Sequence, residues 1–352
     1  MSKKVTTQSP KLFIGMDIHK RSWKVHFTTD LTIGNGKTMP PDPDGLHRYV
    51  NKYYPGHQTS IAYEVGCCGY SAARSFESFS WNTHVVNPAD IPRPSKNAII
   101  KTDKIDAKNI ARQLKSGNLV KLVIPDVPRQ CLRSLTRQRT SLAKDFRRIK
   151  CRIKALMLYY GIEIPEKFDT PTWTLAFLKW LKDFKWNYDT IDQTLKSMLC
   201  QYQFIDLQIK DVSTRIRAYC RKHYKKDYYL LRSVPGIGPI TAVNIISELG
   251  DLRRFQSLKK LAGYVGIAPG MYCSGDNEKF TGATPRANRI IRSLIVEASW
   301  VAIRQDPVLQ QYYRKHAGKD SKAAIFKVAR KLLSRIHAVI KSEITYEIGI
   351  VQ

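Results

Sequence analysis

The sequence lacks the cysteine patterns of a disulfide framework or a zinc finger. Its cysteine count, seven, is odd, and no C-x-x-C pair occurs among positions 67, 68, 131, 151, 200, 220 and 273. Small secreted scaffolds and structural zinc sites depend on such pairs. We therefore expect reduced thiols and a cytoplasmic protein.

Long apolar segments are missing as well. No run approaches the length of a membrane-spanning helix, and the polar start Met1-Ser2-Lys3-Lys4 lacks the apolar stretch of a signal peptide. Neither an amphipathic anchor nor a lipidation signal is found, so we expect no membrane partner. Apolar residues still make up 43% of the 352 residues, which suffices for two or three globular domains.

Acidic residues are scarce. The chain has 29 Asp and Glu against 59 Lys and Arg, which gives a formal net charge of +30. A surface of this charge attracts polyanions, so nucleic acid is the first candidate partner.

Residues 1–125 alternate short β-like runs with helical stretches. Strands are predicted at residues 12–18, 23–27, 59–65 and 83–86, the first two as a hairpin, and helices at residues 43–54, 69–80 and 103–116. Strands mixed with helices in this way predict an α/β sheet domain.

Residues 126–228 are helical and strongly charged. Two apolar seams with near-heptad spacing run from Leu135 to Tyr160 and from Ile191 to Tyr219, and Arg139 interrupts the first. Such seams predict a helical hairpin or an intermolecular coiled coil. Between them the sequence predicts a small cap packed by Trp173, Trp180 and Trp186.

Residues 229–345 are predicted to form an all-α domain with Gly-rich turns, ending in a helix around residues 320–342. Near its start, Ser233-Val234-Pro235-Gly236-Ile237-Gly238-Pro239 precedes an apolar helix. A G-x-G turn before a helix lets backbone N–H groups approach a phosphate, as in a helix–hairpin–helix motif. Gly236 and Gly238 are therefore candidate nucleic-acid contacts, and a plain helix–helix connection is the alternative.

Four carboxylates are placed where they could meet. Asp17 lies in a predicted strand, Glu64 ends another, and Asp103 and Asp106 stand three apart at a helix start, on one helix face. Converging carboxylates repel one another unless cations neutralise them. Two Mg²⁺ ions would do so and would clamp the oxygens of a phosphodiester. The alternative is that these are scattered surface acids.

The motifs around these acids carry a specific resemblance. They are Gly15-Met16-Asp17-Ile18-His19-Lys20, Glu64, Val86-Asn87-Pro88 and Lys101-Thr102-Asp103-Lys104-Ile105-Asp106-Ala107. The sequence here resembles the DEDD domain of the insertion-sequence family numbered 110. The resemblance implies a RuvC-like, RNase-H-type domain with Asp17, Glu64, Asp103 and Asp106 as its metal-binding tetrad. After Glu64 the sequence departs from the family's usual shorter turn.

A basic stretch follows the sheet domain. Between Arg129 and Lys154 lie ten Lys or Arg residues and one acid, Asp145. Phosphate contacts made by such a stretch would be strongly salt-dependent, and a solvated helix face is the alternative. The candidate contacts are Arg133, Arg137, Arg139, Arg147, Arg148, Lys150, Arg152 and Lys154. The resemblance implies a structured guide RNA, the bridge RNA, that pairs with target and donor DNA.

A serine near the C-terminus is the candidate nucleophile. Ser274 lies in Cys273-Ser274-Gly275-Asp276, expected to be an exposed loop, and Arg286, Arg289 and Arg292 could surround a phosphate. No histidine lies nearby in sequence to activate the hydroxyl, and a metal ion from the acidic site could serve instead. The stretch resembles the transposase domain of the same family, which implies that Ser274 is the nucleophile. Cys273 is the adjacent rival.

Together these features predict a DNA recombinase of the transposase kind. Ser274 would form a covalent phosphoserine link with DNA while Mg²⁺ at the acidic tetrad stabilises the charge on the oxygens. The partners would be target and donor double-stranded DNA, the guide RNA and further copies of the chain, as a dimer of dimers at the bacterial nucleoid. Alternatives are a RuvC-like Holliday-junction nuclease that uses activated water, and a non-catalytic nucleic-acid scaffold.

Overall fold

The computed structural model describes residues 9–66, 68–92, 103–274, 277–283, 287–318 and 320–349. The chain divides into two compact units, Met1–Ile124 and Pro125–Gln352, and each is described by itself. None of the helices in the described ranges is long and apolar enough to cross a membrane.

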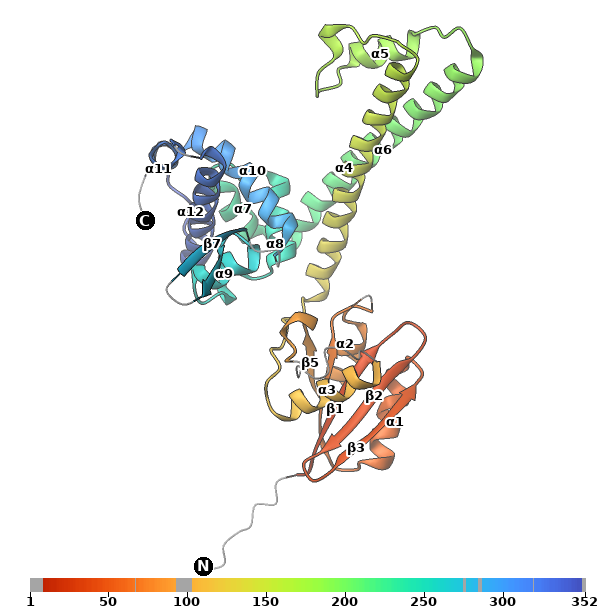
Figure 1. The fold of residues 1–352 in the computed structure, drawn as a ribbon, viewed down its shortest axis with the longest axis vertical. Helices are drawn as coiled ribbons and strands as arrows, with labels where there is room; N and C mark the ends of the chain where they lie inside the picture. Colours follow the sequence, from red (N-terminus) through yellow and green to blue (C-terminus); the bar gives the residue numbers. More distant parts are fainter. Residues whose placement is uncertain are drawn as a thin grey trace, which may run out of the picture. The chain divides into compact units, whose positions relative to one another are not determined.

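The first unit contains a five-stranded sheet of order β3-β2-β1-β4-β5 (Figure 1). Antiparallel strands β1 (Lys11–Ile18), β2 (Trp23–Thr29) and β3 (Ile33–Met39) form a meander, and β4 (Gln58–Glu64) and β5 (Asn82–Val86) extend it in parallel. The helices are α1 (Pro43–Tyr53), α2 (Ser71–Ser78), the short η1 (Pro88–Asp90) and α3 (Asp103–Lys115). The predicted strands and helices are confirmed, and β3 is an addition to them.

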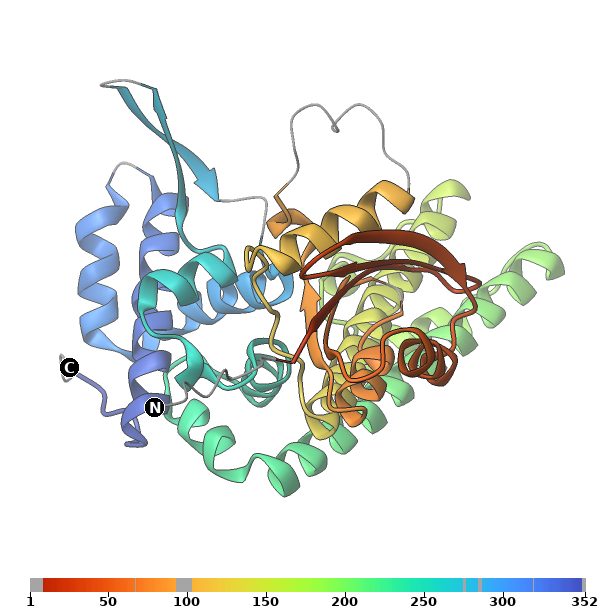
Figure 2. The same ribbon diagram turned by 90° about the horizontal axis from the view of Figure 1, so that it is seen from below.

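Helices cover both faces of this sheet, with α1 and α3 on opposite sides (Figure 2). The face toward α1 and α2 is a continuous core that includes Ile14, Val25 and Phe27. On the other face α3 lies directly against β1, because Gly15 has no side chain. A Cβ at Gly15 would lie 2.2 Å from the carbonyl oxygen of Ala107. This close approach brings the start of α3 to the end of β1.

The second unit begins with a helical hairpin made of α4 (Val127–Tyr159) and α6 (Asp189–His223) (Figure 1). The two helices pack along each other within one chain, which confirms the hairpin alternative. At the interruption, Arg139 Nε donates a hydrogen bond to Ser213 Oγ at 2.9 Å, so the seam holds a polar contact there. The link holds η3 (Glu166–Phe168) and α5 (Leu175–Asp183), and the predicted aromatic cap packs around buried Phe177.

The rest of the second unit shares one apolar core. Its helices are α7 (Lys225–Ser233), α8 (Pro239–Leu249), η4 (Leu252–Arg254), α9 (Leu258–Val265), α10 (Arg289–Gln305), α11 (Pro307–Ala317) and α12 (Ser321–Ser342). The last of these confirms the predicted C-terminal helix. Helices α7 and α8 are joined by the predicted glycine turn, and the helix–hairpin–helix motif stays a prediction.

The prediction of an all-α C-terminal domain is wrong. Strands β6 (Pro269–Ser274) and β7 (Asn277–Ala283) form an antiparallel two-stranded sheet. Met271 pairs with Phe280 and Tyr272 with Lys279, and aromatic residues favour paired strands. The strand pattern was not recognised because it is interrupted by glycine at Gly270 and Gly282. The expected loop position of Ser274 is therefore corrected too: Ser274 is the last residue of β6.

Candidate metal centre

The candidate metal centre lies at the carboxyl ends of two neighbouring parallel strands. Met16 of β1 pairs with Tyr63 of β4, so the next residues, Asp17 and Glu64, follow at the same level. Side chains alternate along a strand, so Asp17 shares the face of Gly15, which is the face that α3 covers. The first turn of α3 supplies Asp103 and Asp106 on this side.

Three side chains come together closely. Ligand atoms of Asp17, His19 and Asp103 all lie within 4.8 Å of one another. His19 Nε2 is 3.2 Å from Asp17 Oδ2 and 3.5 Å from Asp103 Oδ2. The Asp17 side chain is 22% exposed, whereas those of His19 and Asp103 are about half exposed, so the group opens to solvent. Glu64 and Asp106 are half-buried and stand outside this closest group.

The electrostatics of the group favour a cation. Burial raises the pKa of the Asp17 carboxyl, the His19 ring beside it acts in the opposite direction, and the negative charges of Asp103 and Asp106 raise the pKa further. A carboxylate that is disfavoured by burial and by like charges gains stability from a positive ion. Carboxylates and imidazole are ligands of divalent metals such as Mg²⁺, Mn²⁺ and Zn²⁺. The residues present therefore fit a divalent metal ion.

His19 was not among the predicted site residues. The sequence signal was present, because His19 is part of the motif that contains Asp17 and stands directly after the end of β1 at Ile18. Sequence reasoning considered only carboxylates as ligands. The turn after β1 carries the imidazole back toward the Asp17 carboxylate.

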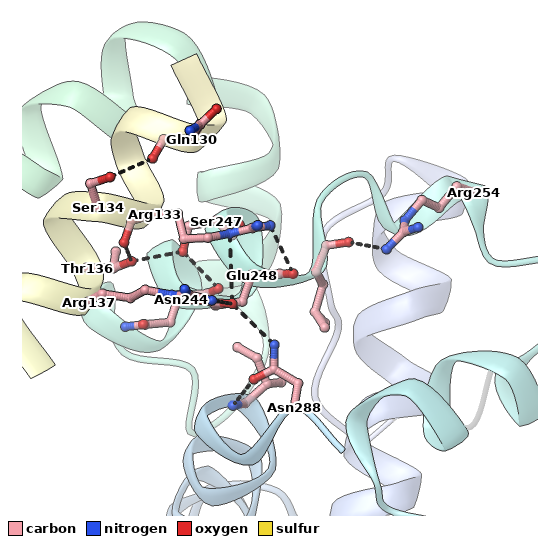
Figure 3. Close-up of polar contacts among 12 residues, drawn as sticks. Gln130, Arg133, Ser134, Thr136, Arg137, Asn244, Ser247, Glu248, Arg254 and Asn288 are labelled. Atoms are coloured by element: carbon pink, nitrogen blue, oxygen red, sulfur yellow. Dashed lines mark hydrogen bonds and ion pairs between the residues drawn. The ribbon is translucent and has the colours of Figure 1, made fainter. Parts of the chain in front are cut away.

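Two arginines of the basic stretch fasten α4 to α8 (Figure 3). Arg137 binds the carboxylate of Glu248 with two hydrogen bonds, Nε to Oε1 at 2.8 Å and Nη2 to Oε2 at 3.1 Å. Arg133 Nε donates to the Ser247 carbonyl oxygen at 3.0 Å. Glu248 is only 3% exposed, so the ion pair is buried on its acidic side. Both arginines have a structural partner, and their contact with nucleic acid stays a prediction.

The outer half of the basic stretch is more open. Arg147, Arg148 and Arg152 are exposed, and Arg148 forms an ion pair with Asp145 at 2.7 Å. Lys150 lies 4.9 Å and 5.4 Å from the ring centroids of Phe146 and Trp173.

Two further candidates on this helix have partners in the second unit. Lys154 forms an ion pair with Asp169 at 2.6 Å. Burial lowers the pKa of Arg139, whose guanidinium faces α6. Of the predicted contacts on this helix, Arg147 and Arg152 are exposed and form no ion pair among the described residues.

The two glycines before α8 differ in role. Gly236 has a φ of 77°, and a Cβ there would lie 2.2 Å from the Ala298 carbonyl oxygen. Its N–H donates to Gln305 Oε1 at 2.9 Å, so this glycine is needed for packing against α10. Gly238 caps α8, and nothing lies within 4 Å of its Cβ position. A side chain would therefore fit at Gly238 and not at Gly236.

The predicted nucleophile is described only in its backbone. Ser274 pairs with Asn277 across the two-stranded sheet, while its side chain and the whole of Arg286 lie outside the described part of the structure. Arg289 is exposed and Arg292 half-buried at the start of α10. Asn288 caps this helix and its side-chain amide donates to Glu248 Oε2 at 3.3 Å. The grouping of Ser274 with these arginines stays a prediction.

A mixed sheet with carboxylates at the ends of its central strands, followed by a mostly helical unit, defines a DEDD nuclease-like domain joined to a helical domain. Residues 14–162 match the family model of DEDD transposases of the IS110 type, and residues 228–314 match the model described as the transposase IS116/IS110/IS902 family. The chain belongs to the IS110 family of transposases.

Known relatives agree with this family. Protein y4qE of Sinorhizobium fredii, a transposase by name, is 32% identical over 242 residues, which are 68% of this chain and 57% of y4qE. The transposase of insertion sequence element IS1533 from Leptospira borgpetersenii is 25% identical over 70% of this chain and 72% of its own. The pilin gene-inverting protein of Moraxella lacunata is 26% identical over 94% of this chain and 96% of its own.

Proposed function

We propose that this chain catalyses DNA strand exchange as the transposase of an insertion sequence. The observation that carries the proposal is the meeting of Asp17, His19 and Asp103 at the end of β1. The carboxylates of this solvent-exposed site repel one another when no cation is bound. A bound metal ion would relieve this repulsion and could stabilise the charge on the oxygens of a phosphodiester. The net charge of +30 supplies the attraction for DNA, and family membership supports the reaction class.

The metal would be Mg²⁺ in a RuvC-like, RNase-H-type domain, held by Asp17, Glu64, Asp103 and Asp106. When bound, it supplies positive charge at the phosphate oxygens, where negative charge grows in the transition state. His19 orients the carboxylates of Asp17 and Asp103 by lying between them. The sheet and α3 hold the ligands on rigid elements, because Gly15 locks α3 onto β1.

Ser274 is the proposed nucleophile for strand cleavage. Its hydroxyl loses a proton, its oxygen forms a bond to phosphorus, and the bond from phosphorus to one deoxyribose oxygen breaks. That oxygen leaves as a free hydroxyl after taking up a proton. The phosphoserine ester conserves the bond, so attack by the hydroxyl of a different strand releases Ser274 and completes the exchange without ATP. Arg286, Arg289 and Arg292 would hold the phosphate.

The remaining partners follow from the same proposal. The exposed arginines of α4 suit phosphate contacts with DNA or with a guide RNA whose base pairing selects both sites. Exchange between two duplexes needs several active sites, which favours a dimer of dimers at the bacterial nucleoid. The Moraxella relative is named for inverting a gene, and strand exchange of that kind is the activity proposed here.

A metal-dependent DNA nuclease is the second candidate. It is favoured by one observation: the first unit alone supplies Asp17, His19 and Asp103. In that case activated water would attack phosphorus and Ser274 would be structural.

The test of a catalytic role is the substitution Asp17→Asn. The full chain, Mg²⁺, the cognate RNA and end-labelled DNA are incubated, and cleaved and exchanged strands are quantified. We expect Asp17→Asn to lower the rate by about a hundredfold or more, as when one group that stabilises transition-state charge is removed. The matched control is Asp44→Asn on α1, an exposed acid that should leave the rate unchanged. Equal, measurable rates for wild type and Asp17→Asn would refute a catalytic role of Asp17, and no cleavage by the wild type would leave the non-catalytic scaffold.

A further inference from the structure

A groove runs along the first unit on the side of the sheet that α3 covers. It consists of two adjoining hollows of about 420 and 520 Å³, which share His26, Ile105 and Lys108. Strand β2 forms the floor, one flank of α3 forms one wall, and the edge strand β3 forms the other. We call it the α3 groove.

The groove is open because the residue of β3 beside the middle of the groove is a glycine, which has no side chain. Gly36 pairs with His26 across the strands, and a Cβ at Gly36 would meet only His26 Nδ1 at 3.6 Å and the Val25 carbonyl oxygen at 3.9 Å. Both distances are ordinary contacts. The space is therefore set by the absence of a side chain at Gly36, and a larger residue there would enter it.

Cationic side chains line the groove, and no carboxylate is among its described lining residues. Four residues supply this charge: Lys24, Lys108, Arg112 and Lys115. Lys108, Arg112 and Lys115 are spaced by four and three along α3, so they share one flank of the helix. Within the described ranges their contacts are with neutral groups. Arg112 Nη2 donates to Asn109 Oδ1 at 2.7 Å, and Lys115 Nζ donates to the Thr29 carbonyl oxygen at 2.8 Å.

The floor contains an unpartnered polar atom. His26 is 6% exposed, and among the described residues its Nε2 has no hydrogen-bond partner. Burial lowers the pKa of His26, and the charge of Lys108 lowers it further, so the ring is neutral at pH 7. Leaving such an atom unsatisfied costs stability, which a polar ligand or the water it brings would recover. Uncompensated cations above a buried, unsatisfied ring are the features of an anion site.

We propose that the α3 groove binds the sugar-phosphate backbone of the DNA strand whose phosphate reacts at the metal centre. The groove leads directly to that centre. Lys24 pairs with Asp17 across β1 and β2, and Ala107, which directly follows Asp106 on α3, lines the groove. This continuity favours the reacting strand, DNA, over a guide RNA held elsewhere. The inference rests on the proposed function in taking DNA as the substrate and the metal centre as the place where it reacts.

The first test removes charge. Binding of labelled single-stranded DNA, duplex DNA and RNA of one sequence is measured by fluorescence polarisation with EDTA present, over a series of salt concentrations. The double variant Lys108→Gln/Arg112→Gln should weaken DNA binding by about tenfold at 0.1 M salt and reduce the slope of log K against log[salt] by about 1 to 2. The control Lys52→Gln/Lys121→Gln removes the same charge from exposed sites outside the groove and should change neither quantity.

The second test fills the space without changing charge. Gly36→Leu should fold, because its Cβ makes only ordinary contacts, and should weaken DNA binding as the charge variant does. Unchanged DNA binding in both variants, or a loss confined to RNA, would overturn the proposal. Asp17→Asn separates the proposed function from the proposal for the groove, since it should abolish strand cleavage and leave the DNA affinity unchanged. A chain that cleaves no DNA, yet loses DNA affinity in the groove variants, would refute the proposed function and leave the groove standing.

Discussion

Removing Arg137 should destabilise the second unit more than removing the charge of its partner Glu248. The Arg137 side chain is 58% exposed, whereas Glu248 is almost fully buried. If Arg137 is truncated to Ala, the carboxylate stays in the interior with Arg133 Nε at 3.8 Å and Asn288 Nδ2 at 3.3 Å as its remaining neighbours. If Glu248 is replaced by Gln, the half-exposed guanidinium of Arg137 can be hydrated by solvent. Arg137→Ala should therefore lower the free energy of unfolding by more than Glu248→Gln does.

The magnitude follows from burial. Breaking a buried ion pair costs about 3 to 5 kcal/mol, and the half-exposed arginine and the two remaining neighbours reduce this to about 2 to 3 kcal/mol for Arg137→Ala. Glu248→Gln keeps one acceptor and should cost about 1 kcal/mol. For a unit of this size, 1 kcal/mol corresponds to about 2 to 4 °C in Tm. Differential scanning calorimetry of the full chain measures both changes.

The double variant Arg137→Ala/Glu248→Gln tests whether the uncompensated buried carboxylate causes the loss of stability. It should be more stable than Arg137→Ala alone, because no buried charge is left without compensation. The control is Asp145→Ala, which removes the exposed pair with Arg148 and should cost less than about 1 kcal/mol. A double variant as unstable as Arg137→Ala, or a cost of Arg137→Ala equal to that of the control, would refute this reasoning.

Two further predictions concern the first unit. Gly15→Ala should displace α3, since its Cβ would lie 2.2 Å from the Ala107 carbonyl oxygen, and lower stability by about 2 kcal/mol or more in a urea titration; Gly36→Ala should not. Because burial raises the pKa of Asp17 in the folded chain, the protonated form favours folding, and this contribution is lost as the pH rises through the folded-state pKa. Asp17→Asn should therefore raise the Tm of the metal-free first unit at pH 7, and the gain should shrink on acidification; an unchanged or lower Tm would contradict it.

The sheet could be predicted because its strands are apolar runs with β-forming residues. Strand β3 could not, since Gly34 and Gly36 weaken any strand pattern and most of its residues are exposed. This segment is a strand because it pairs with β2, and its own sequence pattern does not indicate one. The hairpin of β6 and β7 was missed because Gly270 and Gly282 interrupt its strand pattern.

The sequence predicted the two aspartates of the closest group, Asp17 and Asp103, but not the contact that His19 makes with both. Asp17 and Asp103 could be paired in advance, because a strand end and a helix start meet in an α/β sheet. The position of His19 depends on a turn, which no periodicity reveals. Arg137 reads as a solvated phosphate contact in the sequence, since its partner Glu248 is 111 residues away. Contacts across such separations are set by tertiary packing.

The most direct test of the central claim is a search for protein-linked DNA. The full chain is mixed with Mg²⁺, its cognate RNA and labelled DNA, then denatured and separated by electrophoresis. We expect a covalent adduct that persists in Cys273→Ala and disappears in Ser274→Ala. Cleaved DNA without an adduct, unaffected by Ser274→Ala, would contradict it and assign the cleavage to metal-activated water.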